Sequence, residues 1–226
     1  MTATAYSLFV VGLTALIGSM TYMKRSLVSY RTAVTFSIPA VAGVFVARAF
    51  IIPAIPEHIG DFGGIAVTRD LFIMVLFGIL MLMASMSMIR NGDNQDDTSP
   101  HQVNVKLILV EGFVVGILTG LVGAGGGFLI IPALVVVGGL PMKMAVGTSL
   151  LIISVKSLLG FTGDLGQGGI DWFFLFVFSL FTSSGIFLGT YLSRFIPGSR
   201  LKPAFGWFVL AMGIYVLAKE LFSGQV

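Results

Sequence analysis

A cluster of glycines near the middle of the chain is the feature best suited to bind a ligand. It reads Gly123-Ala124-Gly125-Gly126-Gly127, stands between two apolar stretches and is followed by Pro132. Consecutive glycines break a helix and leave backbone N–H and C=O groups without helical partners, which hydrocarbon tolerates only where they face protein, water or a ligand. The last amides would lie at the positive end of a half-helix that begins near Phe128. The cluster therefore predicts a cavity that receives an oxyanion.

Hydroxyl and cationic side chains in nearby apolar segments could complete this site. Thr148 and Ser149 could donate hydrogen bonds to an oxyanion, but each hydroxyl could equally bond a carbonyl of its own helix. Lys156 could attract the anion, or its long stem could reach the membrane interface. The predicted substrate-binding residues are Ser7, Gly123, Gly125, Gly126, Gly127, Pro132, Thr148, Ser149 and Lys156.

Two further charged residues lie in apolar surroundings. Glu111 comes five residues after Lys106, so it could be a protonatable group that couples transport to an ion gradient, although a carboxylate near the lipid headgroups is the favoured interpretation. Arg48 could be a counter-charge for an anionic substrate, but an interfacial anchor before Pro53 is favoured. Both alternatives remain open at this point.

The chain offers little for catalysis, metal binding or redox chemistry. It has no cysteine, which excludes disulfides, thiolate metal sites and cysteine nucleophiles. His58 and His101 lie in loops without histidine or clustered carboxylate neighbours, so we expect no metal site. The glycine cluster lacks the strand and βαβ unit that a nucleotide-binding fingerprint requires. We expect a protein without catalytic residues or a cofactor, which is not an enzyme.

The composition identifies a membrane as the environment of these residues. Hydrophobic residues make up 56% and charged residues 10% of the 226 positions, against about 25% charged residues in a soluble domain. The basic residues stand singly in short loops, which does not favour nucleic acid as a partner. Most of the apolar segments can cross the roughly 30 Å of a bilayer as helices. We place them at residues 5–22, 32–55, 71–89, 107–122, 128–137, 145–161, 172–192 and 203–222.

Segment lengths and polar stretches give the organisation of the chain. Segment 107–122 is borderline for a span and 128–137 is too short, so we expect two broken or tilted elements that meet inside the membrane. Residues 90–106 form a polar linker, and residues 53–70 form the other sizeable loop. The predicted fold is an all-α polytopic membrane protein with about eight membrane elements. Its predicted parts are a first repeat with three spans (1–90), a linker (91–105) and a second repeat (106–226).

An internal duplication supports this division. Sliding the halves by 142 positions places Ser7 on Ser149, Gly18 on Gly160 and Gly43 on Gly185 without a gap. Weak internal symmetry of this kind is typical of transporters. Small residues four positions apart usually permit close helix packing, and we expect that role for Gly112, Gly116, Gly120, Gly185 and Gly189.

Loop charges predict the orientation of the two repeats. Lys24, Arg25 and Arg31 flank the loop after the first span, whereas its counterpart at 163–171 has two aspartates and no basic residue. The positive-inside rule therefore places the first loop in the cytoplasm and the second outside. The central linker and the loop near Arg194 also carry basic residues and are predicted to be cytoplasmic. The repeats are thus expected to be inverted, with the N-terminus outside.

The second half resembles one repeat of the sulfite exporter TauE/SafE family, also called the toluene sulfonate uptake permease family. The resemblance rests on the glycine-rich stretch with Pro132, the A-x-x-T/S-S-L pattern at 145–150, the I-D-W at 170–172 and the late G-x-x-x-G at 185–189, and it covers residues 106–222. It implies an integral membrane transporter with duplicated halves that exports or takes up a small sulfur oxyanion, coupled to an ion gradient.

Together these features predict a permease or exporter of sulfite or an organosulfur anion such as a sulfonate, in the cell membrane or the inner membrane of a Gram-negative cell. Its expected partners are the lipid bilayer, a small anion, a coupling proton or other ion, and a second copy in a homo-oligomer. Under the 142 offset Met1 falls on Lys143, so the first repeat is expected to lack counterparts of 107–142. The alternative is therefore a non-transporting scaffold or truncated paralogue.

Overall fold

The computed structural model describes residues 2–62, 65–90, 105–122, 127–164 and 171–223. These residues form two compact units. Unit 1 contains Met1–Val34 and Pro141–Gly198, and unit 2 contains Thr35–Leu140 and Ser199–Val226. Each unit combines segments from both halves of the sequence, whereas the predicted repeats divide the chain at the central linker. The repeat boundaries themselves stay a prediction.

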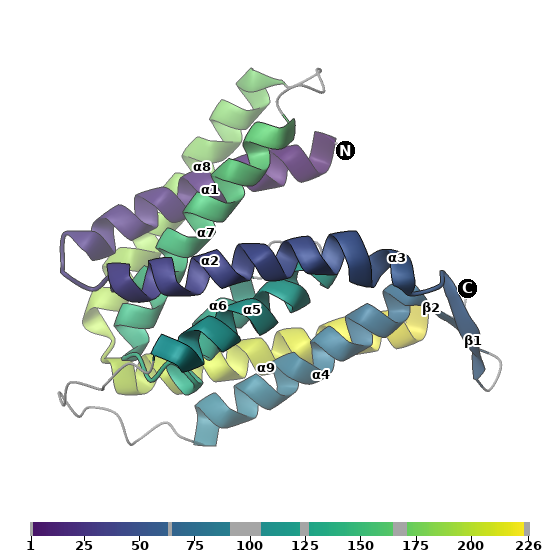
Figure 1. Cartoon of the computed structure of the whole chain (residues 1–226). Coiled ribbons are helices and arrows are strands. Elements are labelled where there is room, and N and C mark those ends of the chain that lie inside the picture. Colours follow the sequence, from purple (N-terminus) through teal and green to yellow (C-terminus); the bar gives the residue numbers. More distant parts are fainter. Residues whose placement is uncertain (1, 63–64, 91–104, 123–126, 165–170, 224–226) are drawn as a thin grey trace. The chain divides into compact units, whose positions relative to one another are not determined.

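Helices make up nearly all of the described structure (Figure 1). They are α1 (Thr2–Met23), α2 (Tyr30–Val46), the π-helix η1 (Ala47–Ile51), α3 (Ile52–Ala54), α4 (Arg69–Arg90), α5 (Val105–Val122), α6 (Gly127–Val136), α7 (Met142–Asp164), α8 (Trp172–Phe195) and α9 (Gly198–Ser223). Within the described ranges, seven helices are long and apolar enough to cross a membrane, and Tyr30–Ala54 counts as one of them. The predicted polytopic helical fold is confirmed, and each predicted apolar segment is a helix.

In unit 1, α1 packs antiparallel to α7. Leu8 lies beside Gly160 near one end of the pair, and Gly18 lies beside Leu150 towards the other. Close to the end of α1, Gly147 leaves room for the backbone of Leu27. These contacts fix the position of α7, which carries Thr148, Ser149 and Lys156, relative to α1.

Parallel to α1 runs α8, and hydroxyl groups join the two helices along their length. The N–H of Asp171 donates to Tyr6 Oη at 2.7 Å, and the side chains of Thr14 and Thr182 bond at 3.0 Å. Near the far end, Tyr22 Oη lies 3.1 Å from Ser193 Oγ. The partners advance together along both helices, so the C-terminal ends of α1 and α8 lie at the same end of unit 1.

In unit 2, α2 and α5 run parallel and approach each other closely at glycine residues of both helices. A Cβ at Gly116 would overlap the backbone of Ala40, and a Cβ at Gly112 would meet the carbonyl of Phe36. Gly43 of α2 in turn meets the backbone of α5 at Phe113. The predicted packing role of the three α5 glycines is confirmed, because only glycine lets the two backbones approach this closely.

Antiparallel packing joins α4 and α9, also in unit 2. Gly206, near the start of α9, lies against Met88 and Ile89 at the end of α4, and Gly78 of α4 lies against Leu217 further along α9. Gly213 meets the side chain of Met81 between these two contacts. Small residues again mark the place where two helices touch.

The packing prediction is wrong for Gly185 and Gly189 of α8. A Cβ added at either position would meet no described atom within 4 Å. Neighbouring side chains on α8 are exposed as well, among them Phe181 and Leu188. The spacing shows only that a close contact is permitted, and here no described helix takes that place.

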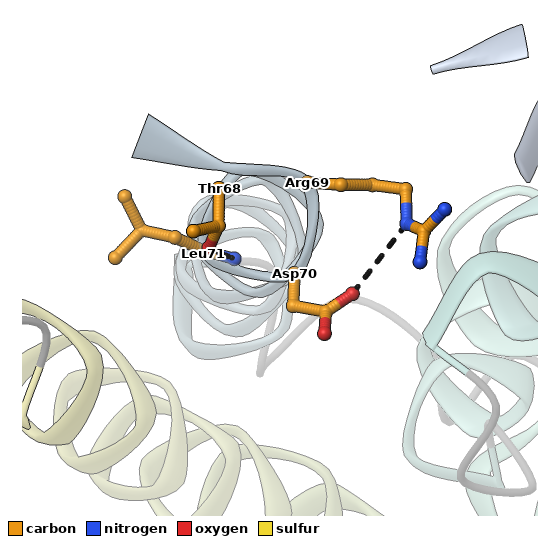
Figure 2. A network of polar contacts seen from close by, with 4 residues as sticks. All are labelled: Thr68, Arg69, Asp70 and Leu71. Carbon is orange, nitrogen blue, oxygen red and sulfur yellow. Dashed lines mark hydrogen bonds and ion pairs between the residues drawn. The ribbon is translucent and has the colours of Figure 1, made fainter. Parts of the chain in front are cut away.

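A β-hairpin forms part of the segment expected as a loop at residues 53–70. β1 (His58–Phe62) pairs antiparallel with β2 (Ile65–Thr68), and Phe62 lies opposite Ile65. The sequence signal was Gly63-Gly64 between the strands, since such pairs favour tight hairpin turns. Figure 2 shows the start of α4 that follows: Thr68 Oγ1 accepts from the N–H of Leu71 at 3.3 Å, and Arg69 Nε lies 3.7 Å from Asp70 Oδ1. The cap explains why α4 begins here.

Helix directions within each unit agree with the directions that the loop charges predict. In unit 1, α1 and α8 are parallel and α7 is antiparallel to both. In unit 2, α2 and α5 are parallel, and α4 and α9 are antiparallel to each other. The duplication also pairs Leu8 with Leu150 and Gly18 with Gly160. The contact of Leu8 with Gly160 therefore corresponds to a contact of Leu150 with Gly18, and both contacts occur. Any two-fold relation between the duplicated helices gives this exchange, and the antiparallel directions of α1 and α7 fit an inverted duplication. These relations support the inverted repeat, which stays a prediction.

Candidate functional site

The glycine cluster lies between the end of α5 at Val122 and the start of α6 at Gly127. Predicted site residues Gly123, Gly125 and Gly126 fall outside the described residues. Gly127 is the first residue of α6, whose 10 residues extend over about 15 Å at 1.5 Å per residue. This is about half of a bilayer's hydrocarbon thickness. The broken pair is therefore present as expected, with one full helix and one half-helix.

The N-terminus of α6 has the properties that an anion site needs. The N–H groups of its first turn have no carbonyl partner within the helix, and the helix dipole adds partial positive charge there. Leu129, Ile130 and Leu134 are buried and hold α6 in unit 2, where it packs on α4 and α5. Pro132 is buried within the helix and removes one further backbone donor.

The parallel crossing of α2 and α5 carries η1 to the same end of α5. Gly120 meets Ala47, the first residue of η1, two positions before α5 ends. Arg48 follows Ala47 and is exposed. Arg48 therefore lies next to the residue of η1 that contacts α5 close to the end of that helix. Both interpretations of Arg48, as an interfacial anchor or a counter-charge, remain predictions.

A π-helix at this point has a cause in the sequence. The N–H of Ile52 bonds the carbonyl of Ala47, five residues earlier, and Pro53 follows without an N–H to donate. A proline so placed disturbs the regular ladder over the preceding turn, and π-turns inside helices often occur at functional sites. This distortion was not predicted, although Pro53 is its signal in the sequence.

Glu111 is buried within unit 2. It is 7% exposed, and neither carboxylate oxygen has a hydrogen-bond partner among the described residues. The favoured interpretation, a carboxylate near the headgroups, does not match this burial. The burial of Glu111 follows from its position along the helix. Glu111 lies on the same side of α5 as the buried residues Ile108, Val115 and Thr119 and next to the packing glycines. A buried ionisable group in a membrane helix marks a functional position by default.

In unit 1, Thr148 fixes the turn before α2. Its Oγ1 accepts from the N–H of Ser29 at 3.0 Å, and its side chain is fully buried. Ser29 in turn caps α2, because its Oγ lies 2.8 Å from Thr32 Oγ1 and its carbonyl accepts from the N–H of Ala33. Thr148 therefore has a structural task, and its binding role stays a prediction.

The remaining predicted residues of unit 1 differ in their surroundings. Ser149 is buried and donates to the carbonyl of Val146 at 2.9 Å. This is the second of the two alternatives given for Ser149 from the sequence, a bond to a carbonyl of its own helix. Lys156 is half-buried in α7, and Ser7 is exposed on α1. The repeat counterparts Ser7 and Ser149 thus do not share an environment.

Comparisons with known proteins agree with these features. The sequence model described as Sulfite exporter TauE/SafE matches residues 1–216. A probable membrane transporter protein of Xylella fastidiosa is 31% identical over 64% of this chain and 58% of its own length. A probable membrane transporter protein of Bacillus subtilis is 26% identical over 96% of this chain and 81% of its own length.

A third relative, a probable membrane transporter protein of Methanocaldococcus jannaschii, is 36% identical over 49% of this chain and 43% of its own length. The chain thus spans little more than half of the length of the first curated relatives it matches. No solved structure matches it.

Proposed function

Because this chain belongs to the sulfite exporter TauE/SafE family, we propose that it is a transporter that moves a small anion across the cell membrane. The proposed substrate is sulfite or an organosulfonate. The observation that carries the proposal is the pairing of a full helix, α5, with the half-helix α6 across a glycine cluster. Interrupted helices whose half-helix N-termini point at an anion are a recurrent binding device of secondary transporters.

The proposed contacts to the substrate are backbone N–H groups. They belong to Gly123, Gly125, Gly126 and Gly127 and to the first turn of α6. Backbone amides suit a sulfur oxyanion because several of them can donate to its oxygens, and their capacity to donate does not depend on the protonation state of a side chain. Lys156, Thr148, Ser149 and Ser7 of unit 1 remain predicted contributors.

Coupling to a proton gradient is assigned to Glu111. Its carboxyl is buried and lacks a hydrogen-bond partner in the described structure, so the charged form is not stabilised by an ion pair or a donor. It lies on α5, the helix that leads to the glycine cluster, beside the tight contact of Gly112 with α2. Protonation of such a group changes the charge of a helix interface and so can bias the movement of the helix that carries it.

Flux through proteoliposomes tests the transport activity. The full chain is reconstituted, and uptake of radiolabelled sulfite and of a radiolabelled sulfonate is followed with and without an imposed proton gradient. We expect saturable flux that increases with the gradient. No flux of either compound from correctly inserted protein would favour the scaffold alternative.

A matched pair of variants tests the binding site. Gly126→Leu adds a branched side chain where the amides must reach the anion, and we expect saturable flux to be lost while membrane insertion is kept. Gly185→Leu is the control, because no described atom lies within 4 Å of a Cβ at that position. Normal flux through the Gly126 variant would contradict the proposed site.

A further inference from the structure

A groove runs along unit 1 between the C-terminal halves of α1 and α8. Its volume is about 740 Å³, within the range of roughly 300–1,000 Å³ that small-molecule sites occupy. The residues that line it are Ile17, Met20, Thr21, Lys24, Arg25, Phe187, Leu188, Thr190 and Tyr191. Both helices are visible side by side in Figure 1, and their hydroxyl contacts hold them together along the groove.

The wall of the groove is apolar. Met20, Phe187 and Leu188 are 50%, 56% and 64% exposed, so their side chains are open to an occupant. The two threonines add little polarity, because Thr21 Oγ1 donates to the carbonyl of Ile17 at 3.3 Å and Thr190 Oγ1 to that of Ile186 at 2.8 Å. A hydrocarbon chain fits such a wall.

One end of the groove is cationic. Lys24 and Arg25 are exposed and lie in the turn after α1, which Ser26 closes with a φ of 54°. The N–H of Arg25 and that of Leu27 both donate to the carbonyl of Tyr22, which fixes the backbone that carries both cations. No carboxylate pairs with Lys24 or Arg25 in the part of the chain that the structure describes.

Charge is separated along unit 1. Its acidic residues in sequence are Asp164 and Asp171. Asp164 is the last residue of α7 and Asp171 directly precedes α8, so both lie at the end of unit 1 opposite to Lys24 and Arg25. The cationic end is the one that loop charges assign to the cytoplasm. Anionic lipids give the cytoplasmic leaflet a negative surface, and basic pockets between membrane helices on that side bind their headgroups.

We propose that this groove binds one anionic phospholipid of the cytoplasmic leaflet. Its phosphate lies at Lys24 and Arg25, and one acyl chain lies on Phe187 and Leu188. A small transported oxyanion has no apolar part to cover this wall. A zwitterionic lipid would bring an ammonium group towards two cations. Unit 1 of a second copy would offer no carboxylate at this end, because its two acidic residues lie at the opposite end.

Native mass spectrometry of the full chain, purified in detergent, tests the proposal. The protein is mixed with dioleoyl phosphatidylglycerol, with dioleoyl phosphatidylcholine, or with glycerol phosphate, which carries the phosphate without the chains. We expect one phosphatidylglycerol to be retained, with about tenfold higher occupancy than phosphatidylcholine. Glycerol phosphate is expected not to bind.

Two double variants separate the groove from general surface charge. Lys24→Gln with Arg25→Gln should lower phosphatidylglycerol occupancy about tenfold. Arg90→Gln with Arg200→Gln removes the same charge from exposed positions of unit 2 and should leave occupancy unchanged. Thermal unfolding and size-exclusion chromatography of both variants establish that they are folded.

Three results would overturn the proposal. These are equal retention of both lipids, an equal loss of phosphatidylglycerol in the two double variants, and a dimer in lipid-free samples that the Lys24 and Arg25 changes dissociate. The last result would assign the groove to a second copy of the chain.

Discussion

At the scale of single residues, the chemistry of a side chain allows several roles, and the neighbouring residues in the fold determine which role it has. Glu111 could have been solvated or buried. It lies on the same side of α5 as the packing glycines, which puts it in the interior of unit 2, where no described residue pairs with its carboxylate. Thr148 and Ser149 stand next to each other, but one accepts from the backbone of Ser29 and the other donates within its own helix. Hydroxyl chemistry alone could not separate these two roles, because both are available to any serine or threonine in a helix.

Glu111→Gln is the residue-scale prediction. Glutamine keeps the volume but cannot take up and release a proton, so we expect flux down a substrate gradient to continue while the response to a proton gradient is lost. The measurement is proteoliposome flux at several imposed gradients. Glu57→Gln, at an exposed carboxylate in the 53–70 segment, is the control that should behave as the unchanged protein. A Glu111 variant that still responds fully would remove the carboxylate from the coupling mechanism.

At the scale of elements, the same spacing has opposite consequences in two helices. Gly112 and Gly116 of α5 meet backbone atoms of α2, whereas Gly185 and Gly189 of α8 meet no described atom within 4 Å. Spacing of four puts small residues on one helix face in both cases, but among the described residues a partner helix occupies that face in α5 and none does in α8. The α5 crossing matters for the site because it fixes α5, and with it the start of the glycine cluster, against α2 and η1.

A pair of single-methyl variants measures this difference. Gly116→Ala places a Cβ on the backbone of Ala40, so the helices must separate, and we expect a loss of about 1–3 kcal/mol in stability. Gly185→Ala faces open space and should be neutral or stabilising by up to about 1 kcal/mol through helix propensity. Thermal unfolding of the purified variants in detergent gives both values. Equal melting temperatures would contradict the close α2–α5 contact.

At the scale of the whole molecule, charge and packing give the same set of helix directions within each unit. The two are independent, because the loop charges depend on the sequence alone and the helix contacts carry no information about charge. Their agreement in both units supports the predicted orientation, with the loop after α1 and the start of α9 in the cytoplasm. With the loop after α1 in the cytoplasm, as predicted, the cationic end of the unit 1 groove would lie on the side where anionic lipids are found.

Single-cysteine labelling tests this orientation. Since the chain has no cysteine, each introduced thiol reports alone. Glu57→Cys is expected to react with a membrane-impermeant maleimide in intact cells. Arg200→Cys is expected to react only after the membrane is permeabilised. The reverse pattern would invert the assigned orientation, while labelling of both positions in intact cells would contradict the predicted path of the chain.

The sequence by itself determined the helical membrane fold, the eight apolar segments and the place of the break between α5 and α6. These follow from local physics: the length of apolar runs against the bilayer thickness, and the inability of consecutive glycines to continue a helix. The structure alone decided that Gly116 packs and Gly185 does not, that Glu111 is buried, and that Lys24 and Arg25 stand at the end of an apolar groove. Each of these depends on which helix lies opposite, and segments distant in sequence supply that neighbour.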